Sequence, residues 1–323
     1  MHAHMPLIRD IVYEAVNRGA SLATLCQALD VSVDELSDSA LKMDFERACK
    51  AWEQAVLLTK DDLLGLHIGE STTTSILGMV GNLMQSSPDL FTAFENLSKY
   101  FSTASDMFHY RIKVSGDEAT IVYEPAALWI RASPQTARHS TERSMSGTLR
   151  VFYLLTGKKI KPLRVRFRHK RVGSLSEYNR VFDLTPQFNA PASELIFSKA
   201  AILTRVVSHD RSLFSVFEKM LLEKKSRGSE STSEQIKRLL ISDFRGQIPS
   251  LEIIAAQIHM TPRTVQRKLT EEGTTFRTLT ADIQKELAQR FMKLTGSNLS
   301  QVAGFLGYSD PSAFRRAYKK WRN

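Results

Sequence analysis

The stretch LEIIAAQIHMTPRTVQRKL, residues 251–269, decides the fold of the C-terminal part of the chain. Apolar residues recur in its first half at helical spacing: Leu251, Ile254, Ala255 and Ile258. Thr261 is suited to cap a second helix, and Pro262 suits the first position of that helix. Val265 and Leu269 lie four residues apart, so they turn one face of the second helix inward. The pattern predicts a helix-turn-helix unit.

The same pattern returns 48 positions later in LSQVAGFLGYSDPSAFRRAYKKW, residues 299–321. Here Asp310 takes the capping position and Pro311 the first helical position. Phe314 and Tyr318 are predicted to face inward. A second helix-turn-helix unit follows from this repeat of apolar spacing, turn and basic helix.

Between the two copies, apolar residues recur at intervals of 3, 4, 4, 4 and 3: Phe276, Leu279, Ile283, Leu287, Phe291 and Leu294. This spacing draws one apolar stripe along a helix of about five turns. The C-terminal domain, residues 236–323, is therefore predicted to be all-α, with a long helix that joins its two helix-turn-helix units.

The segments MTPRTVQRKLTEEGTTFRTL (260–279) and QVAGFLGYSDPSAFRRAYKKW (301–321) resemble the DNA-binding domain of the AraC/XylS family of bacterial transcription regulators. The resemblance implies that both recognition helices enter successive major-groove segments about 34 Å apart. It implies base-edge contacts from these residues: Arg263, Gln266, Arg267, Pro311, Ser312, Arg315 and Arg316. Lys268 and Lys319 are expected on phosphates, which position the protein without specifying sequence. The alternative for these side chains is a solvated helix face.

The charge distribution agrees with a nucleic-acid partner for the C-terminal domain. The chain has a formal net charge of +10, and residues 233–323 hold 15 Lys and Arg against 8 Asp and Glu. The basic excess therefore lies where the motif predicts contact with phosphate.

The N-terminal part, residues 1–222, reads as an α+β domain. Helices are predicted near its start, with Ile8, Ile11 and Val12 on one buried stripe, Ser21 as a cap, and a longer helix over 45–58. The segments DDLLGLHIGE (61–70), LGMVGNLMQSSPDLFTAFENLSKYF (77–101) and YNRVFDLTPQFNAPASELIFS (178–198) resemble the arabinose-binding-type effector domain that precedes the DNA-binding part in many AraC-family members.

Within this domain, period-two alternation predicts strands that flank a long helix over 134–155. The expected strands are 108–114 and 119–125, joined by a turn at 115–117, then 128–132 and 163–171. Strand 163–171 carries a basic face that is either solvated or in contact with an acidic ligand or DNA.

Helices packed on such a sheet can enclose a small-molecule cavity. Its candidate lining residues are aromatic: Phe101, Phe108, Tyr110, Tyr123, Trp129 and Tyr153. Arg131, Arg138 or Arg143 is the candidate partner for a carboxylate. Ordinary core packing is the alternative for each of these residues.

Residues 223–235 are polar and rich in small residues without apolar period, so they are predicted to form a linker. Before them, an apolar stripe runs along a predicted helix: Leu213, Val216, Phe217, Met220 and Leu221. This stripe either packs on its own domain or pairs with a second subunit in a homodimer.

Motifs for other classes of protein are absent from the sequence. The stretch around Ser146 and Gly147 lacks the flanking glycine of a nucleophile elbow, and the histidines form no HExxH pair. Cys26 and Cys49 form no pattern of a zinc site. We expect no catalytic residues, no metal, no cofactor and no membrane span, and we expect a cytoplasmic location.

The sequence thus predicts a DNA-binding transcription regulator, an activator by family resemblance. Its expected partners are double-stranded promoter DNA, RNA polymerase and a small-molecule effector whose identity the sequence leaves open. Two alternatives stay open: a ligand-independent regulator whose N-terminal domain only mediates dimerisation, and an enzyme with an unrecognised site.

Overall fold

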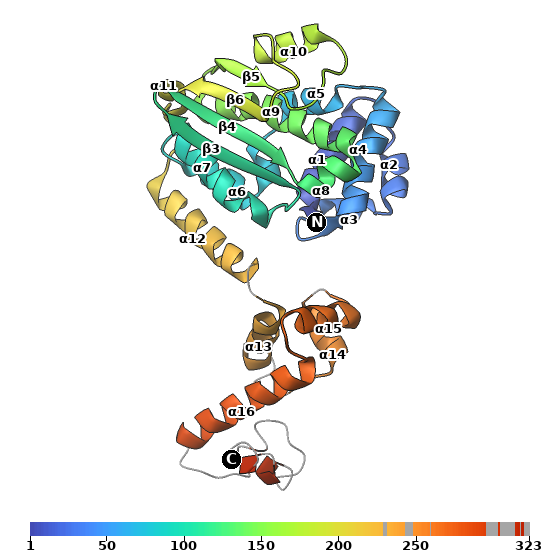
Figure 1. Cartoon of the computed structure of the whole chain (residues 1–323), viewed down its shortest axis with the longest axis vertical. Helices are drawn as coiled ribbons and strands as arrows, with labels where there is room; N and C mark the ends of the chain where they lie inside the picture. The colour runs from blue at the N-terminus through green and yellow to red at the C-terminus, as the bar shows by residue number, and fades with distance from the viewer. Residues whose placement is uncertain are drawn as a thin grey trace. The chain divides into compact units, whose positions relative to one another are not determined.

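The computed structural model describes the following residues: 1–228, 231–242, 248–258, 260–294, 303, 314–316 and 318–319, without the side chains of 226–228, 238, 241–242 and 290–294. Two compact units, Met1–Lys225 and Ser226–Asn323, divide the chain. Figure 1 shows the helices and strands of both units.

Short helices open the first unit. They are α1 (Met5–Asn17), α2 (Leu22–Leu29), α3 (Val33–Ser37) and α4 (Phe45–Thr59), beside a small antiparallel sheet of β1 (His2–His4) and β2 (Lys42–Asp44). The predicted stripe of α1 is confirmed, since Ile8, Ile11 and Val12 are at most 3% exposed. Ser21 caps α2 as predicted, because its side chain accepts a hydrogen bond from the backbone N–H of Thr24.

A second group of helices follows in the chain: α5 (Leu64–Ser71), η1 (Thr74–Leu77), α6 (Met79–Ser86), α7 (Leu90–Tyr100) and η2 (Phe101–Thr103). Asp89 caps α7, because its side chain accepts from the backbone N–H of Thr92.

A four-stranded antiparallel sheet forms the other half of the first unit, in the order β3-β4-β6-β5. The predicted hairpin is confirmed as β3 (Phe108–Ser115) and β4 (Glu118–Pro125), with Gly116 in the turn at φ +58°. Figure 1 shows the sheet on one side of the helical part of the unit. The N-terminal unit is therefore α+β, as predicted.

The prediction of a strand over 128–132 is wrong. This segment is the helix α8 (Ala127–Ala132), in which Trp129 is buried while Leu128 is 51% exposed. Trp129 Nε1 donates to Thr136 Oγ1 at 2.7 Å, which ties α8 to the following helix. Five residues are too few for their apolar pattern to separate a strand from one helical turn and a half.

The strand predicted over 163–171 is much shorter than expected. Only β5 (Arg164–Arg166) pairs with β6 (Ser193–Ser198), since the backbone N–H of Phe167 turns to the carbonyl oxygen of Gln187. Its basic face is partly paired within the chain, because Arg164 contacts Glu118 and Arg166 lies 3.3 Å from Glu194.

The long helix α9 (Pro134–Thr156) confirms the prediction for 134–155 and lies at the centre of the unit. It contacts α4 and α5 as well as β4 and β6. The contact with α5 is close: a Cβ atom added at Gly65 would lie 2.1 Å from the carbonyl oxygen of His139, and one at Gly69 would lie 2.6 Å from that of Arg143. Only glycine fits at these two positions of α5.

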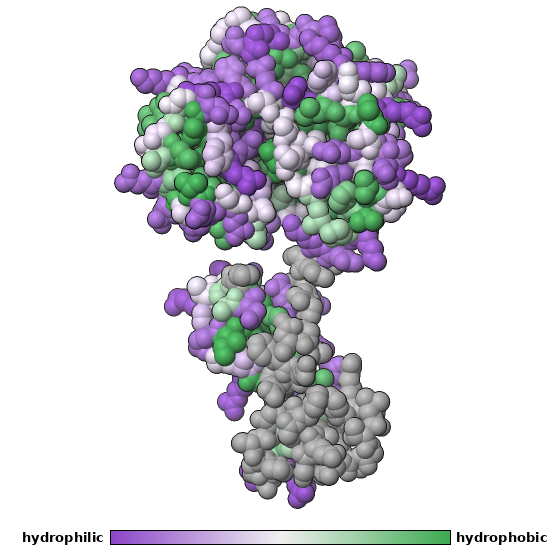
Figure 2. Space-filling view, turned by 180° about the vertical axis from the view of Figure 1, so that it is seen from behind, coloured by the Kyte–Doolittle hydropathy of each residue, from purple (hydrophilic) through white to green (hydrophobic). Residues whose placement is uncertain are grey.

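Three further helices complete the unit: α10 (Leu175–Phe182), α11 (Lys199–Ile202) and α12 (Arg211–Gly228). Polar residues cover most of the visible face of the unit, with apolar patches between them (Figure 2). Within the described residues, none of the helices combines the length and the apolar character that crossing a membrane requires.

The second unit begins with α13 (Thr232–Ser242), α14 (Leu251–Gln257), α15 (Pro262–Glu271) and α16 (Phe276–Leu294). Its described core is apolar: Ile236, Leu240, Ile254, Ala255, Val265, Leu269 and Ile283. The Thr261 side chain accepts from the backbone N–H of Thr264, and Pro262 opens α15, as predicted. The long connecting helix is confirmed as α16. Most of the second predicted helix-turn-helix unit lies outside the described residues.

The segment predicted as a linker, residues 223–235, contains the end of one helix and the start of another. Helix α12 continues to Gly228, and α13 starts at Thr232. The Glu272 carboxylate accepts from the backbone N–H groups of Thr232 and Ser233, at 2.7 and 2.9 Å, and so stabilises the start of α13. The polar composition of the segment did not predict these helix ends, because Glu272, which caps α13, lies 40 positions after Thr232 in the chain.

We predict that Gly65→Ala destabilises the first unit by about 1–3 kcal/mol, because the new methyl group overlaps the backbone of α9. Without that overlap, alanine would favour the helix by about 1 kcal/mol. Urea unfolding followed by tryptophan fluorescence measures the change. Ser71→Ala, at an exposed position of α5, is the control and should change stability by less than about 0.5 kcal/mol. A Gly65→Ala protein as stable as the wild type would show that the helices separate freely.

Candidate functional site

The outer face of α15 carries the side chains predicted to read DNA. Val265 and Leu269 are fully buried, which leaves Arg263, Gln266 and Arg267 exposed. Lys268 is half-buried at the edge of this face. Arg267 Nε lies 3.9 Å from a carboxylate oxygen of Glu271, and such an exposed pair holds the guanidinium only weakly.

Part of the second predicted recognition helix is described. Residues 314–316 and 318–319 are helical; Phe314 is buried, and Arg315, Arg316 and Lys319 are exposed. The rings of Phe314 and Tyr318 stack with centroids 5.8 Å apart, on the face predicted to point inward. Pro311 and Ser312 lie outside the described residues.

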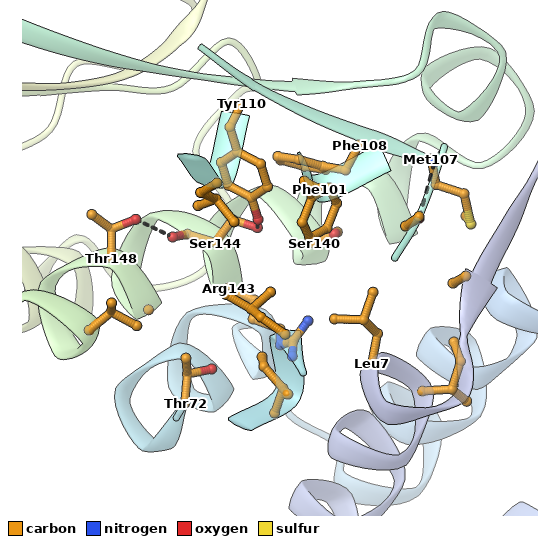
Figure 3. A pocket seen from close by; sticks show the side chains of 18 of the residues that line it. Leu7, Thr72, Phe101, Met107, Phe108, Tyr110, Ser140, Arg143, Ser144 and Thr148 are labelled. Atoms are coloured by element: carbon orange, nitrogen blue, oxygen red, sulfur yellow. Dashed lines mark hydrogen bonds between the residues drawn. The ribbon is translucent and has the colours of Figure 1, made fainter. Parts of the chain in front are cut away.

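The first unit encloses a cavity of about 90 Å³ between its helices and its sheet. Residues from α1, α4, α7, β3 and α9 line it, and Figure 3 shows several of their side chains around the open space. Most of the lining is apolar or aromatic, as with Leu7, Trp52 and Phe101. Arg143 is the charged residue among the lining residues that the structure describes.

Arg143 reaches from α9 into this cavity (Figure 3). Its Nη2 donates to an Asp10 carboxylate oxygen on α1 at 2.5 Å. The Nε atom of Arg143 and the Oγ1 atom of Thr72 are buried, and within the described residues neither has a hydrogen-bond partner. The two residues are only 9% and 7% exposed. Buried polar atoms without partners are costly, so their position at a cavity indicates a place for a ligand.

Other polar groups of the cavity wall are paired within the protein. Tyr110 Oη lies 3.1 Å from Ser144 Oγ, and Tyr123 Oη lies 2.7 Å from Thr148 Oγ1. Burial raises the pKa of both tyrosines, so they are neutral hydroxyl groups at physiological pH.

A second, larger cavity of about 570 Å³ opens near the same helix, beside Tyr123, Arg138 and His169. The positive charge of Arg138 in its wall is balanced by Glu142, because Arg138 Nη1 donates to both carboxylate oxygens of Glu142 at 3.0 and 2.9 Å. Tyr178 Oη donates to the same carboxylate at 2.5 Å. Burial lowers the pKa of His169 to about 4, so this ring is neutral at physiological pH, and its Nε2 lies 3.6 Å from Glu142.

The second cavity has the larger volume, whereas the first has more buried polar atoms without a hydrogen-bond partner among the described residues. In the second cavity Arg138 is held by Glu142, and His169 Nε2 is the unpartnered buried atom among the described lining residues. In the first, Arg143 Nε and Thr72 Oγ1 are both unpartnered, although Arg143 Nη2 is paired with Asp10. We regard the first cavity as the candidate site, because it combines an apolar wall with the unpartnered buried atoms of Arg143 and Thr72.

The residues predicted to line the site lie in different parts of the first unit. Four of the aromatic residues line the first cavity: Phe101, Phe108, Tyr110 and Trp129. Tyr123 lies at the second cavity, and Tyr153 is 48% exposed. Among the arginines, Arg143 lines the cavity and Arg131 is exposed.

The sequence did not reveal Thr72, Leu7 or Trp52 as cavity residues. They come from three separate parts of the chain and meet only in the folded unit. Cys26 and Cys49 are buried free thiols. Across the part of the chain that the structure describes, no three His, Cys, Asp or Glu side chains gather to hold a metal ion.

Comparison with known proteins covers both units. The arabinose-binding N-terminal domain of AraC transcription regulators matches residues 19–206, and a helix-turn-helix domain matches residues 254–323. The chain is 24% identical to the ornithine utilization regulator of Pseudomonas aeruginosa, over 99% of this chain and 92% of that protein. It is 27% identical to the HTH-type transcriptional regulator VirS of Mycobacterium tuberculosis, over 80% of this chain and 75% of that protein. The crystal structure of the P. aeruginosa regulator CdpR covers 93% of each chain at 21% identity, with a TM-score of 0.46.

Proposed function

The chain belongs to the family of AraC transcription regulators with an arabinose-binding-type N-terminal domain, and we propose that a small molecule bound in that domain controls its action at a promoter. We assign the effector and dimerisation roles to residues 1–222 and DNA reading to residues 236–323. The protein then acts in the cytoplasm, and it activates transcription through contact with RNA polymerase.

The observation that carries ligand control is the cavity of the first unit with its two unpartnered polar atoms, Arg143 Nε and Thr72 Oγ1. A domain that served only for dimerisation has no need of a buried cation with an open donor. An unsatisfied buried donor costs about 1–3 kcal/mol, and a bound ligand that accepts from it removes this cost.

For DNA reading, we propose that Arg263, Gln266 and Arg267 contact base edges from α15, where all three side chains are exposed. Pro311, Ser312, Arg315 and Arg316 take the same role in the second recognition helix, and Lys268 and Lys319 contact phosphates. Arginine pairs with guanine and glutamine with adenine through two hydrogen bonds, so these residue types suit sequence reading.

We predict that ligands of the cavity stabilise the first unit and change promoter occupancy. A compound present at 100 times its Kd raises the free energy of unfolding by about 2.7 kcal/mol. Thermal unfolding of the full chain against a chemically diverse set of small molecules detects such compounds, and footprinting with each of them measures occupancy. Thr72→Val should keep the stability of the fold and weaken binding, because Thr72 Oγ1 has no partner to lose. A diverse set without any stabilising compound would favour the ligand-independent alternative.

For the DNA contacts, Arg267→Ala and Arg316→Ala should each reduce specific affinity by about 1–3 kcal/mol and relax discrimination at one position. Lys268→Ala should weaken specific and non-specific binding alike and reduce the salt slope by about one. Fluorescence anisotropy on promoter DNA from the neighbouring genes, at two salt concentrations, measures both effects. Arg111→Ala, an exposed arginine of the first unit, is the control. Unchanged specific affinity in the first two variants would refute the base contacts.

We also propose that α12 pairs two copies of the chain. Leu213, Val216 and Met220 share one face of this helix and are 49%, 52% and 45% exposed. Val216→Glu should turn a dimer into a monomer in analytical ultracentrifugation, because the carboxylate would lose its water at the interface. Ser215→Glu, on the same helix beside this face, should leave the mass unchanged. A wild-type monomer at micromolar concentration would contradict the proposal.

A further inference from the structure

We propose that the effector is a small monocarboxylate with an apolar body, and that its carboxylate competes with Asp10 for Arg143. This inference rests on the proposed function, in which the cavity of the first unit holds the effector. It adds the chemical class of the ligand and the contact that the ligand breaks.

The lining of the cavity selects against polar ligands. Its walls are formed mainly by apolar and aromatic side chains, among them Leu7, Phe101 and Phe108. Of the hydroxyl groups, those of Ser144 and Thr148 are already engaged by Tyr110 and Tyr123. A sugar, with a hydroxyl on almost every carbon, would leave several of these groups without partners in such a space.

The open donors of the cavity select for an anion. The guanidinium of Arg143 has donors and no acceptor, so it matches a carboxylate, which has acceptors only. Its Nε is buried and unpartnered, and the Thr72 hydroxyl, also unpartnered, is suited to donate to the same anion. A ligand ammonium group would instead be repelled by Arg143.

Charge balance makes the ligand a competitor of Asp10. Arg143 and Asp10 together are neutral, so a bound carboxylate would leave one buried negative charge in excess. Asp10 is the anion that can leave, since its side chain is 15% exposed and so has access to water. Binding therefore replaces an ion pair between α1 and α9 with one between the ligand and α9.

Release of Asp10 removes the ion pair between α1 and α9, while α1 keeps its packing against α4 and α3. Helix α1 is connected to the end of the first unit. It follows β1 directly, and His4 of β1 lies near Lys224 of α12. Burial, and after it the charge of Lys224, lowers the pKa of His4 to about 4. Helix α12 continues along the chain into the second unit. The ion pair of Asp10 is thus connected through α1 and β1 to the helix that precedes the DNA-reading part.

The volume of the cavity limits the size of the ligand. A cavity of about 150 Å³ holds benzene in another protein, and this one measures about 90 Å³. In proportion it accommodates about four non-hydrogen atoms, the size of acetate, and a longer chain requires side chains of the wall to move.

The test compares straight-chain carboxylates from acetate to octanoate with primary amides and amines of the same lengths. Isothermal titration calorimetry on the full chain gives each Kd. We expect an optimum among the short carboxylates and at least tenfold weaker binding of the matched amide. The fluorescence of Trp52 and Trp129, which line the cavity, should change only with the compounds that bind.

Two variants test the competition with Asp10. Asp10→Asn removes the competing charge with little change of shape, so carboxylates should bind several-fold tighter while amides stay unchanged. In the double variant Asp10→Asn/Arg143→Gln the preference for carboxylates should vanish. Asp183→Asn, at an exposed aspartate paired with Lys161, is the matched control and should bind like the wild type. Thermal unfolding confirms that each variant is folded.

The outcomes separate this inference from the proposed function. If amides bind as well as carboxylates, or if Asp10→Asn weakens carboxylate binding, the inference is overturned while a ligand-controlled regulator stands. The same holds if only neutral compounds stabilise the protein in the diverse set. If neither that set nor the carboxylate series contains a binder, ligand control itself fails. The comparison of carboxylates with amides on the wild-type protein decides the question even where a variant does not fold.

Discussion

The first unit depends on the burial of a polar helix. Helix α9 is in contact on one side with β4 and β6 and on the other with α4 and α5, so its polar side chains must find partners inside the protein. Gly65 and Gly69 let α5 approach closely enough for this. Ser146 Oγ, for example, donates to the carbonyl oxygen of Leu66 at 2.8 Å. Among the described residues of α9, Arg143 and Arg150 each keep a buried Nε without a partner, and that of Arg143 belongs to a residue that lines the first cavity.

Local signals explain what could be predicted from the sequence. The cap at Thr261, Pro262 in the first turn and the apolar stripe that includes Ile283 are properties of short segments, and α15 and α16 follow them. The hairpin of β3 and β4 was equally readable, because alternation and turn chemistry agree there. The strand prediction for residues 128–132 failed because α8 is fixed by a hydrogen bond from Trp129 to Thr136 of the following helix. The apolar pattern of five residues does not contain this contact.

The candidate site was predictable only in part, for a similar reason. Arg143 could be named from its place in the α+β domain, but sequence gave no ground to prefer it over Arg131 or Arg138. The difference arises from partners that lie far apart in the chain: Arg138 is held by Glu142 on its own helix, whereas Arg143 meets Asp10 from 133 positions away and keeps one donor open. Thr72 carries no signal at all until α5 and α9 are packed together.

The same buried ion pair explains how a weakly bound molecule can act as a switch. A buried pair adds little net stability, because the loss of hydration offsets most of its attraction, yet removal of one partner alone is strongly destabilising. A ligand carboxylate that replaces Asp10 leaves Arg143 paired throughout, so the exchange between the two states costs little. A ligand shifts such an equilibrium only by its difference in affinity for the two states. In the state where Asp10 is paired with Arg143, the ligand must displace it, and in the other state it need not, so the ligand binds the second state more tightly. By linkage, promoter binding then changes the affinity for the ligand by the same factor.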